Sequence, residues 1–157
     1  MADKAEVLEE LGSRYDAFRA RIADLPDAAY NETWLGDWNL SQLLAHMAGW
    51  YREMSGAIAR VGRGEPPAPI GVDYSEADSW NVKFARDARP GKAALADWDE
   101  AFAGYREAAA TLDDSQYGID PAKNRPRIGN RLLDGAGIHH FDEHQPQLES
   151  WLASRSS

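Results

Sequence analysis

The spacing of hydrophobic residues predicts amphipathic helices along most of the chain. A first apolar stripe, with members three and four residues apart, covers residues 7–25 and stops at a proline. A second stripe predicts a helix over residues 40–61, and Asn39 with Gln42 provides the polar pair of a capping box at its start. The connection between these two helices, residues 27–38, is rich in aromatic residues.

The second half of the chain alternates helical patterns with glycine- and proline-rich segments. Residues 62–73 hold six such helix breakers and predict a long crossover. The pattern then becomes helical over residues 74–88 and again over 91–112, whereas residues 113–129 have the composition of a loop. A last helix is predicted over residues 130–153. We find no convincing strand and no internal repeat.

These elements predict an all-α protein, a four-helix bundle with a long crossover between the second and third helices. The chain has 157 residues, which suits a single domain covering residues 1–157. It is 43% hydrophobic with six Trp and six Tyr, a composition that excludes intrinsic disorder.

Charge and composition limit the partners of this protein. The formal net charge of −9 argues against nucleic acid and anionic membranes, which bind basic surfaces. The absence of cysteine excludes disulfides, a catalytic thiolate of the protein's own and cysteine-bound zinc. No apolar run is long enough to span a membrane, and no secretory signal is evident at the N-terminus. We therefore expect a cytoplasmic protein whose partner is a small-molecule substrate.

Three of the four histidines predict a metal site. His140 and His144 lie four residues apart, so a helix projects both imidazoles from one face, within an apolar row. His46 lies beside the apolar seam of the predicted second helix. A third imidazole from a facing helix completes a three-histidine site that leaves coordination positions open for water or substrate, as catalytic zinc sites do. Imidazole ligands do not identify the metal.

Other readings of this region stay open. Each buried histidine could instead bond a carbonyl or carboxylate in the core. His139 lies about 100° round the helix from His140, and we take it as a flanking residue that could exchange roles with His140. Asp142 and Glu143 either orient imidazoles or are solvated charges, and we favour the second.

Small residues and a proline lie close to these histidines. Gly49 and Gly137 each lie about one turn from a candidate ligand, where they either leave room for a bound molecule or allow close helix contact. Pro146 has no N–H group to complete the helical pattern, which predicts a local kink.

Several aromatic and charged residues could belong to a pocket. Trp38, Trp50 and Trp80 either form its apolar wall or pack in the core. Glu53 lies two turns beyond His46 on the same line, where a surface carboxylate is a simpler interpretation than a proton acceptor.

The only basic cluster of this acidic chain covers residues 123–127, and Arg131 lies just after it. It could bind a carboxylate of a thiol cofactor or substrate. We prefer the interpretation that it is a solvated loop offsetting the charges of Asp113, Asp114 and Asp120.

Three segments of the chain form a recognisable set: Trp38-Asn39-Leu40-Ser41, Leu43-Leu44-Ala45-His46 with Trp50, and His140-Phe141-Asp142-Glu143-His144. With them the chain resembles, over nearly its whole length, the DinB/YfiT-like superfamily of bacterial metal-binding four-helix bundles. Residues 45–50 and 78–81 resemble the DfsB/ClbS branch.

The resemblance implies a crossed bundle and a divalent ion, commonly zinc or nickel, held by histidines that here would be His46, His140 and His144. Characterised relatives include S-transferases and isomerases that use a low-molecular-weight thiol. The DfsB/ClbS branch includes a self-protection protein that opens a reactive cyclopropane in a genotoxin. Dimerisation is plausible for such bundles.

The leading hypothesis is a metal-dependent enzyme that activates water or a low-molecular-weight thiol for attack on a small electrophile, as a hydrolase or a thiol S-transferase of detoxification or resistance type. The catalytic residues are not assigned. The alternative is a non-catalytic protein that sequesters a small hydrophobic toxin or metabolite. A third interpretation is a helix bundle in which the histidines only satisfy one another's hydrogen-bonding groups and bind no metal.

Overall fold

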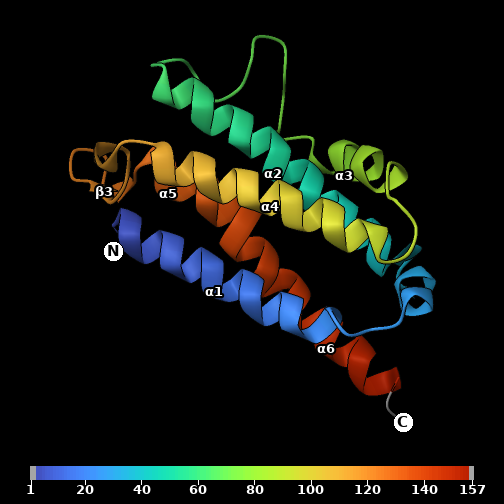
Figure 1. Ribbon diagram of the computed structural model, residues 1–157. Helices are drawn as coiled ribbons and strands as arrows, with labels where there is room; N and C mark the ends of the chain where they lie inside the picture. Colours follow the sequence, from blue (N-terminus) through green and yellow to red (C-terminus); the bar gives the residue numbers. More distant parts are fainter. Residues whose placement is uncertain (1–2, 156–157) are drawn as a thin grey trace.

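Four long helical segments pack together in the computed structural model, which describes residues 3–155 (Figure 1). They are α1 (Lys4–Ile22), α2 (Leu40–Gly62), α4 (Ala93–Thr111) and a C-terminal segment made of α5 (Ile128–Leu133), the π-helical turn η3 (Asp134–Ile138) and α6 (His139–Arg155). The predicted all-α four-helix bundle is therefore confirmed. Within residues 3–155, no helix is both long enough and apolar enough to cross a membrane.

The start of α2 matches its sequence prediction in atomic detail. The Asn39 side chain accepts a hydrogen bond from the backbone N–H of Gln42 at 2.8 Å, and the Gln42 side chain accepts one from the backbone N–H of Asn39 at 2.9 Å. This capping box satisfies two N–H groups that a helix start otherwise leaves unpaired. It also fixes where the helix begins, and so sets the face on which His46 projects.

The crossover after α2 is longer than predicted. Regular structure resumes only at α3 (Ala77–Arg86), so Tyr74 lies in the crossover and not in a helix. Helix α3 packs directly on α2, where a Cβ added to Gly49 would overlap the ring of Phe84. Gly49 therefore serves close helix contact, which was one of its two interpretations.

The C-terminal segment is not the continuous α-helix that was predicted over residues 130–153. The π-helical turn η3 interrupts it, while α6 continues through Pro146, so the departure from α-helical geometry lies upstream of the predicted kink. A Cβ added to Gly137 within η3 would lie 2.6 Å from Leu11 Cδ1 and 3.2 Å from the Tyr105 hydroxyl oxygen. Gly137 thus also allows close packing, here against α1 and α4.

Two small antiparallel hairpins interrupt connections that were predicted to lack strands. Strand β1 (Thr33–Leu35) pairs with β2 (Trp38–Asn39), and β3 (Ile119–Asp120) pairs with β4 (Arg125–Pro126). Single turns of 3₁₀ helix precede them, η1 (Asp27–Asn31) and η2 (Asp114–Gln116). Strands of two or three residues are too short to produce a recognisable alternation of apolar and polar positions.

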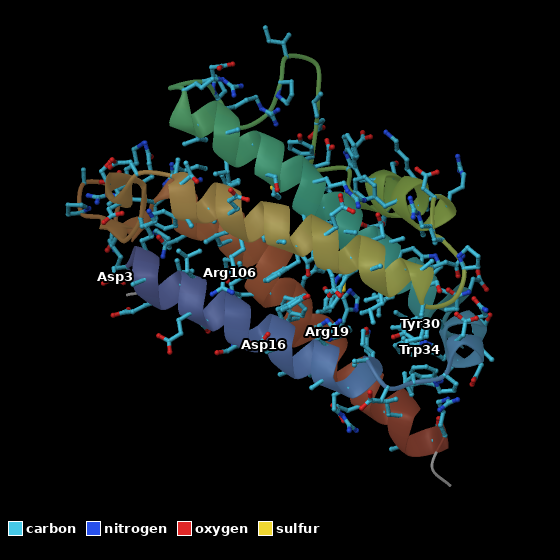
Figure 2. All side chains as sticks on the ribbon, in the orientation of Figure 1. Asp3, Asp16, Arg19, Tyr30, Trp34 and Arg106 are labelled. Carbon is cyan, nitrogen blue, oxygen red and sulfur yellow. The ribbon has the colours of Figure 1, made fainter. Side chains whose placement is uncertain are left out.

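Aromatic side chains fill the space between the helices. Phe18 from α1, Trp98 from α4 and Phe141 from α6 meet with ring centroids 5.7–6.3 Å apart. Burial of each such side chain contributes roughly 1.5–3 kcal/mol. At the edge of this core, the guanidinium of Arg19, labelled in Figure 2, donates two hydrogen bonds of 2.9 Å to Asp99 and links α1 to α4.

Candidate metal centre

Helices α2 and α6 bring three imidazoles together. Each of His46, His140 and His144 offers one ring nitrogen, and these nitrogens all lie within 4.8 Å of one another. The ring centroid of His46 lies 4.6 Å from that of His140 and 5.5 Å from that of His144. A metal ion placed between the rings could contact all three nitrogens, which is the arrangement that the sequence predicted.

Burial keeps the imidazoles of His46 and His140 in the form that binds metals. His46 and His144 are 2% and 7% exposed, and His140 is partly exposed. Burial, together with His140 and His144, lowers the pKa of His46 to about 2, against weak opposition from the backbone of Leu43. Burial and His144 likewise lower the pKa of His140 to about 4. Neutral imidazole is the ligand form, so protons compete little for these two rings near neutral pH.

Two of the three rings are oriented by acceptors in the C-terminal segment, one in η3 and one in α6. Nδ1 of His140 donates to the backbone carbonyl of Ala136 at 3.2 Å, and Nδ1 of His144 donates to the side-chain oxygen of Gln147 at 2.7 Å. A carbonyl oxygen can only accept, so Nδ1 carries the proton in both rings. The lone pair of each ring is then on Nε2, the nitrogen left for a metal.

The third ring has an unsatisfied nitrogen. Nδ1 of His46 is buried and has no hydrogen-bond partner of ordinary geometry in the described part of the chain. The indole of Trp38 packs against the ring, with centroids 5.1 Å apart. A buried unpaired nitrogen costs about 1–3 kcal/mol, so His46 lacks the orienting acceptor that the other two rings have. Three imidazole nitrogens that lie within 4.8 Å of one another are a donor set that fits a transition metal.

A pocket of about 320 Å³ opens beside His140. It lies between α2, the crossover, α3 and the C-terminal segment, and its walls are largely apolar and aromatic. The lining residues are Trp50, Met54, Tyr74, Ala77, Asn81, Gly135, Ala136, His139, His140 and Glu143. A molecule in this pocket would lie next to one of the three imidazoles.

Polar contacts hold the aromatic wall of the pocket. The indole N–H of Trp50 donates to the side-chain oxygen of Asn81 at 2.6 Å, which joins α2 to α3. The Tyr74 hydroxyl donates to Glu53 at 3.3 Å, so Glu53 supports the wall and does not line the pocket. Trp80 lies behind the wall, with its ring centroid 6.0 Å from that of Trp50. Of the three predicted tryptophans, only Trp50 faces the pocket.

The neighbours of the histidine pair have roles that differ from one another. His139 is exposed and lines the pocket, in agreement with its interpretation as a flanking residue. Asp142 orients no imidazole; it accepts a hydrogen bond from Arg14 on α1 at 2.6 Å. Glu143 is exposed at the pocket. The groups that orient the rings, Ala136 and Gln147, were missed.

One of the missed groups had a signal in the sequence. Gln147 lies three residues after His144, and side chains at that spacing are neighbours on a helix. The carbonyl of Ala136 gave no such signal, because every residue has a carbonyl and only the local backbone geometry decides which one is free.

The sequence of this chain matches a known protein family. A family described as the mycothiol maleylpyruvate isomerase N-terminal domain matches residues 8–142. Among curated proteins, none is significantly similar in sequence to this chain.

Solved structures share the fold at low sequence identity. A Streptococcus pneumoniae protein superimposes with a TM-score of 0.78 at 11% identity, over 98% of this chain and 92% of its own. A structure described as sibling lethal factor precursor DfsB gives 0.77 at 14%, over 99% and 98%. The mycothiol-dependent maleylpyruvate isomerase gives 0.71 at 16%, over 94% of this chain but only 61% of its own. The chain is therefore similar to part of that enzyme.

Proposed function

The chain belongs to the mycothiol maleylpyruvate isomerase N-terminal domain family of the DinB-like superfamily, and from this premise we propose that it is a metal-dependent enzyme acting on a small electrophile. His46, His140 and His144 would hold a divalent transition ion, zinc or nickel. The proposal rests on one observation: three imidazole nitrogens lie within 4.8 Å of one another, beside a pocket.

The bound ion would supply Lewis acidity, which lowers the pKa of water or of a low-molecular-weight thiol toward neutrality. The chain's own residues orient the metal ligands and shape the pocket. Ala136 and Gln147 hold two imidazoles in one tautomer, so that Nε2 faces the site. Trp50 and Tyr74 exclude water from one side of the pocket and offer aromatic surface to an apolar substrate.

A thiol-dependent reaction is favoured over simple hydrolysis by the relatives. A matching structure is described as a mycothiol-dependent maleylpyruvate isomerase. In a thiol transfer, the thiol gives its proton to solvent, its sulfur forms a bond to an electrophilic carbon, and the bond from that carbon to its leaving group breaks. In a thiol-dependent isomerisation, the sulfur adds to a double bond and is eliminated again as the same thiol. This chain has no cysteine, so the sulfur must come from a separate thiol molecule. We therefore propose a thiol S-transferase or isomerase ahead of a hydrolase.

Metal content is the decisive measurement. Protein purified without a histidine tag should retain a transition metal, by elemental analysis, in the wild type and in His139→Ala, and should lose it in His46→Ala. His139→Ala is the matched control, because His139 is exposed and adjacent to a proposed ligand. A wild-type protein that holds no transition metal even after reconstitution would remove the proposal.

Activity separates catalysis from sequestration. Wild-type protein should accelerate the reaction of mycothiol with maleylpyruvate or with a chlorodinitrobenzene, and His46→Ala should not. The pocket of about 320 Å³ is also consistent with a binding protein for a small hydrophobic molecule. That alternative predicts no turnover and tight binding of an apolar ligand that survives the His46→Ala substitution.

A further inference from the structure

A second pocket, of about 300 Å³, lies at the β3–β4 hairpin, at the end of the bundle near the N-terminus (Figure 1). Its lining includes four cationic side chains and one carboxylate, that of Asp120: the cations are Lys123, Arg125, Arg127 and Arg131. Arg131 precedes His140 by nine residues, roughly 13 Å of helix, and none of the three histidines of the candidate metal centre lines this pocket.

None of the three carboxylates that were expected to offset this basic cluster forms an ion pair with it, although Asp120 lines the pocket. Asp114 forms an ion pair with Lys4 at 3.1 Å. Asp113 accepts a hydrogen bond from the backbone N–H of Ser115 at 2.9 Å. Asp120 accepts one from the backbone N–H of Ala122 at 3.0 Å. Among the described residues, no ion pair involves any of the four cationic side chains of the pocket. The single negative charge of Asp120 offsets at most one of their four positive charges.

Backbone contacts hold the hairpin and two of its guanidinium groups. Arg127 donates from its backbone N–H to the carbonyl of Gly118 at 2.8 Å and from its side chain to the carbonyl of Tyr117 at 3.3 Å. Arg131 donates from Nε to the carbonyl of Pro126 at 3.1 Å. Each of these guanidinium groups uses one nitrogen in this way, which orients it and leaves further N–H donors for a ligand.

We infer that this pocket binds a small molecule that carries two or more anionic oxygens, such as a phosphate or carboxylate compound. Guanidinium groups present paired N–H donors whose spacing matches the oxygens of phosphate and carboxylate. The rest of the molecule repels anions, since the whole chain carries a net charge of −9, so an anion is favoured only where cations gather. The site is separate from the metal centre and does not depend on the proposed reaction.

The test is calorimetric titration of the full chain with inorganic pyrophosphate and, separately, with citrate, at low ionic strength. The site variant is Lys123→Gln with Arg125→Gln, because both side chains are exposed and neither contributes a side-chain hydrogen bond or ion pair to the described structure. The control variant is Arg86→Gln with Arg89→Gln, which removes the same charge from an exposed position elsewhere.

We expect at least one probe to bind the wild type with a Kd below about 1 mM. The site variant should bind at least about tenfold more weakly, and the control variant as the wild type does. Preference for pyrophosphate identifies a phosphate ligand, and preference for citrate a carboxylate ligand. Binding of neither probe, binding that persists in the site variant, or equal weakening in both variants would overturn the inference. Metal loss in His46→Ala is a separate readout, so failure of one proposal does not imply failure of the other.

Discussion

At the scale of single residues, the candidate metal centre depends on how each imidazole is held. His144 is oriented by Gln147 and His140 by Ala136, whereas Nδ1 of His46 has no hydrogen-bond partner in the described structure. Groups that bond the outer nitrogen of a ligating histidine fix its tautomer and raise its basicity. The two acceptors therefore matter for metal affinity although neither would touch the ion.

Replacing Gln147 with Ala should weaken metal binding by about tenfold while leaving the fold intact. We expect this modest loss of metal affinity, and not a larger one, because Gln147 is exposed and water can replace its oxygen as the acceptor. Competition titration against a chromophoric chelator measures the affinity. Gln145→Ala is the control, since Gln145 bonds Glu149 on the same helix and touches no imidazole. Equal affinity in the two variants would contradict an orienting role for Gln147.

At the scale of elements, the π-helical turn η3 decides the position of His140. In this turn the backbone N–H of His139 bonds the carbonyl of Asp134, five residues back. The wider turn shifts the hydrogen-bond pattern, and the carbonyl of Ala136 accepts from the His140 ring. Such turns are costly in isolation and are frequent at functional sites. In this turn Gly137 packs closely against Leu11 and Tyr105, and we expect this packing to stabilise the turn.

Gly137→Ala should destabilise the protein by about 1–3 kcal/mol, because its methyl group would lie 2.6 Å from Leu11 Cδ1 in a fully buried site. Gly135→Ala lies in the same turn, and its methyl group would meet nothing within 4 Å. We expect Gly135→Ala, the control, to raise the free energy of unfolding by no more than about 1 kcal/mol. Urea unfolding measures both. A similar loss in the two variants would show that close packing does not hold the turn.

Some elements were predictable from sequence and others were not. The capping box at Asn39 and the apolar stripes depend on residues a few positions apart, so their pattern is legible in the chain. The π-helical turn lies in the middle of a predicted helix, at the point where Gly137 packs against Leu11 and Tyr105, which lie far away in sequence. Helical periodicity carries no information about such distant contacts.

At the scale of the whole molecule, stability comes from the aromatic core more than from surface charge. Exposed ion pairs such as Arg21 with Glu149, at 2.9 Å, link α1 to α6 but contribute little to stability, because water and salt screen their charges. Neutral buried histidines oppose this stability in acid, because the unfolded chain can protonate them and the folded chain cannot.

The metal-free protein should lose stability as the pH falls from about 6.5 to 5. In that range the unfolded chain protonates His46 and His140, while the folded rings, with pKa values of about 2 and about 4, stay neutral. The unfolded state then binds more protons, so the free energy of unfolding decreases with falling pH, by up to about 1.4 kcal/mol per pH unit for each ring.

Urea unfolding at several pH values measures this slope. His140→Gln should reduce it by about half, because one of the two rings is removed. Glu32 and Glu149, whose pKa values are lowered by hydrogen bonds from arginine, act in the same direction only below about pH 4.5. A slope that is flat between pH 6.5 and 5, or unchanged in His140→Gln, would contradict buried neutral imidazoles.

The sequence alone determined the helical bundle, the long crossover and the three histidines as candidate ligands. These follow from local periodicity and from residue chemistry, which are properties of neighbouring positions. Only the tertiary structure decided that His46 meets His140 and His144 and that Ala136 and Gln147 orient two rings. It also decided that the hairpin cations form no ion pair within the described part of the chain. Each of these depends on contacts or backbone geometry that packing between helices imposes, and such packing is not encoded at any fixed spacing along the chain.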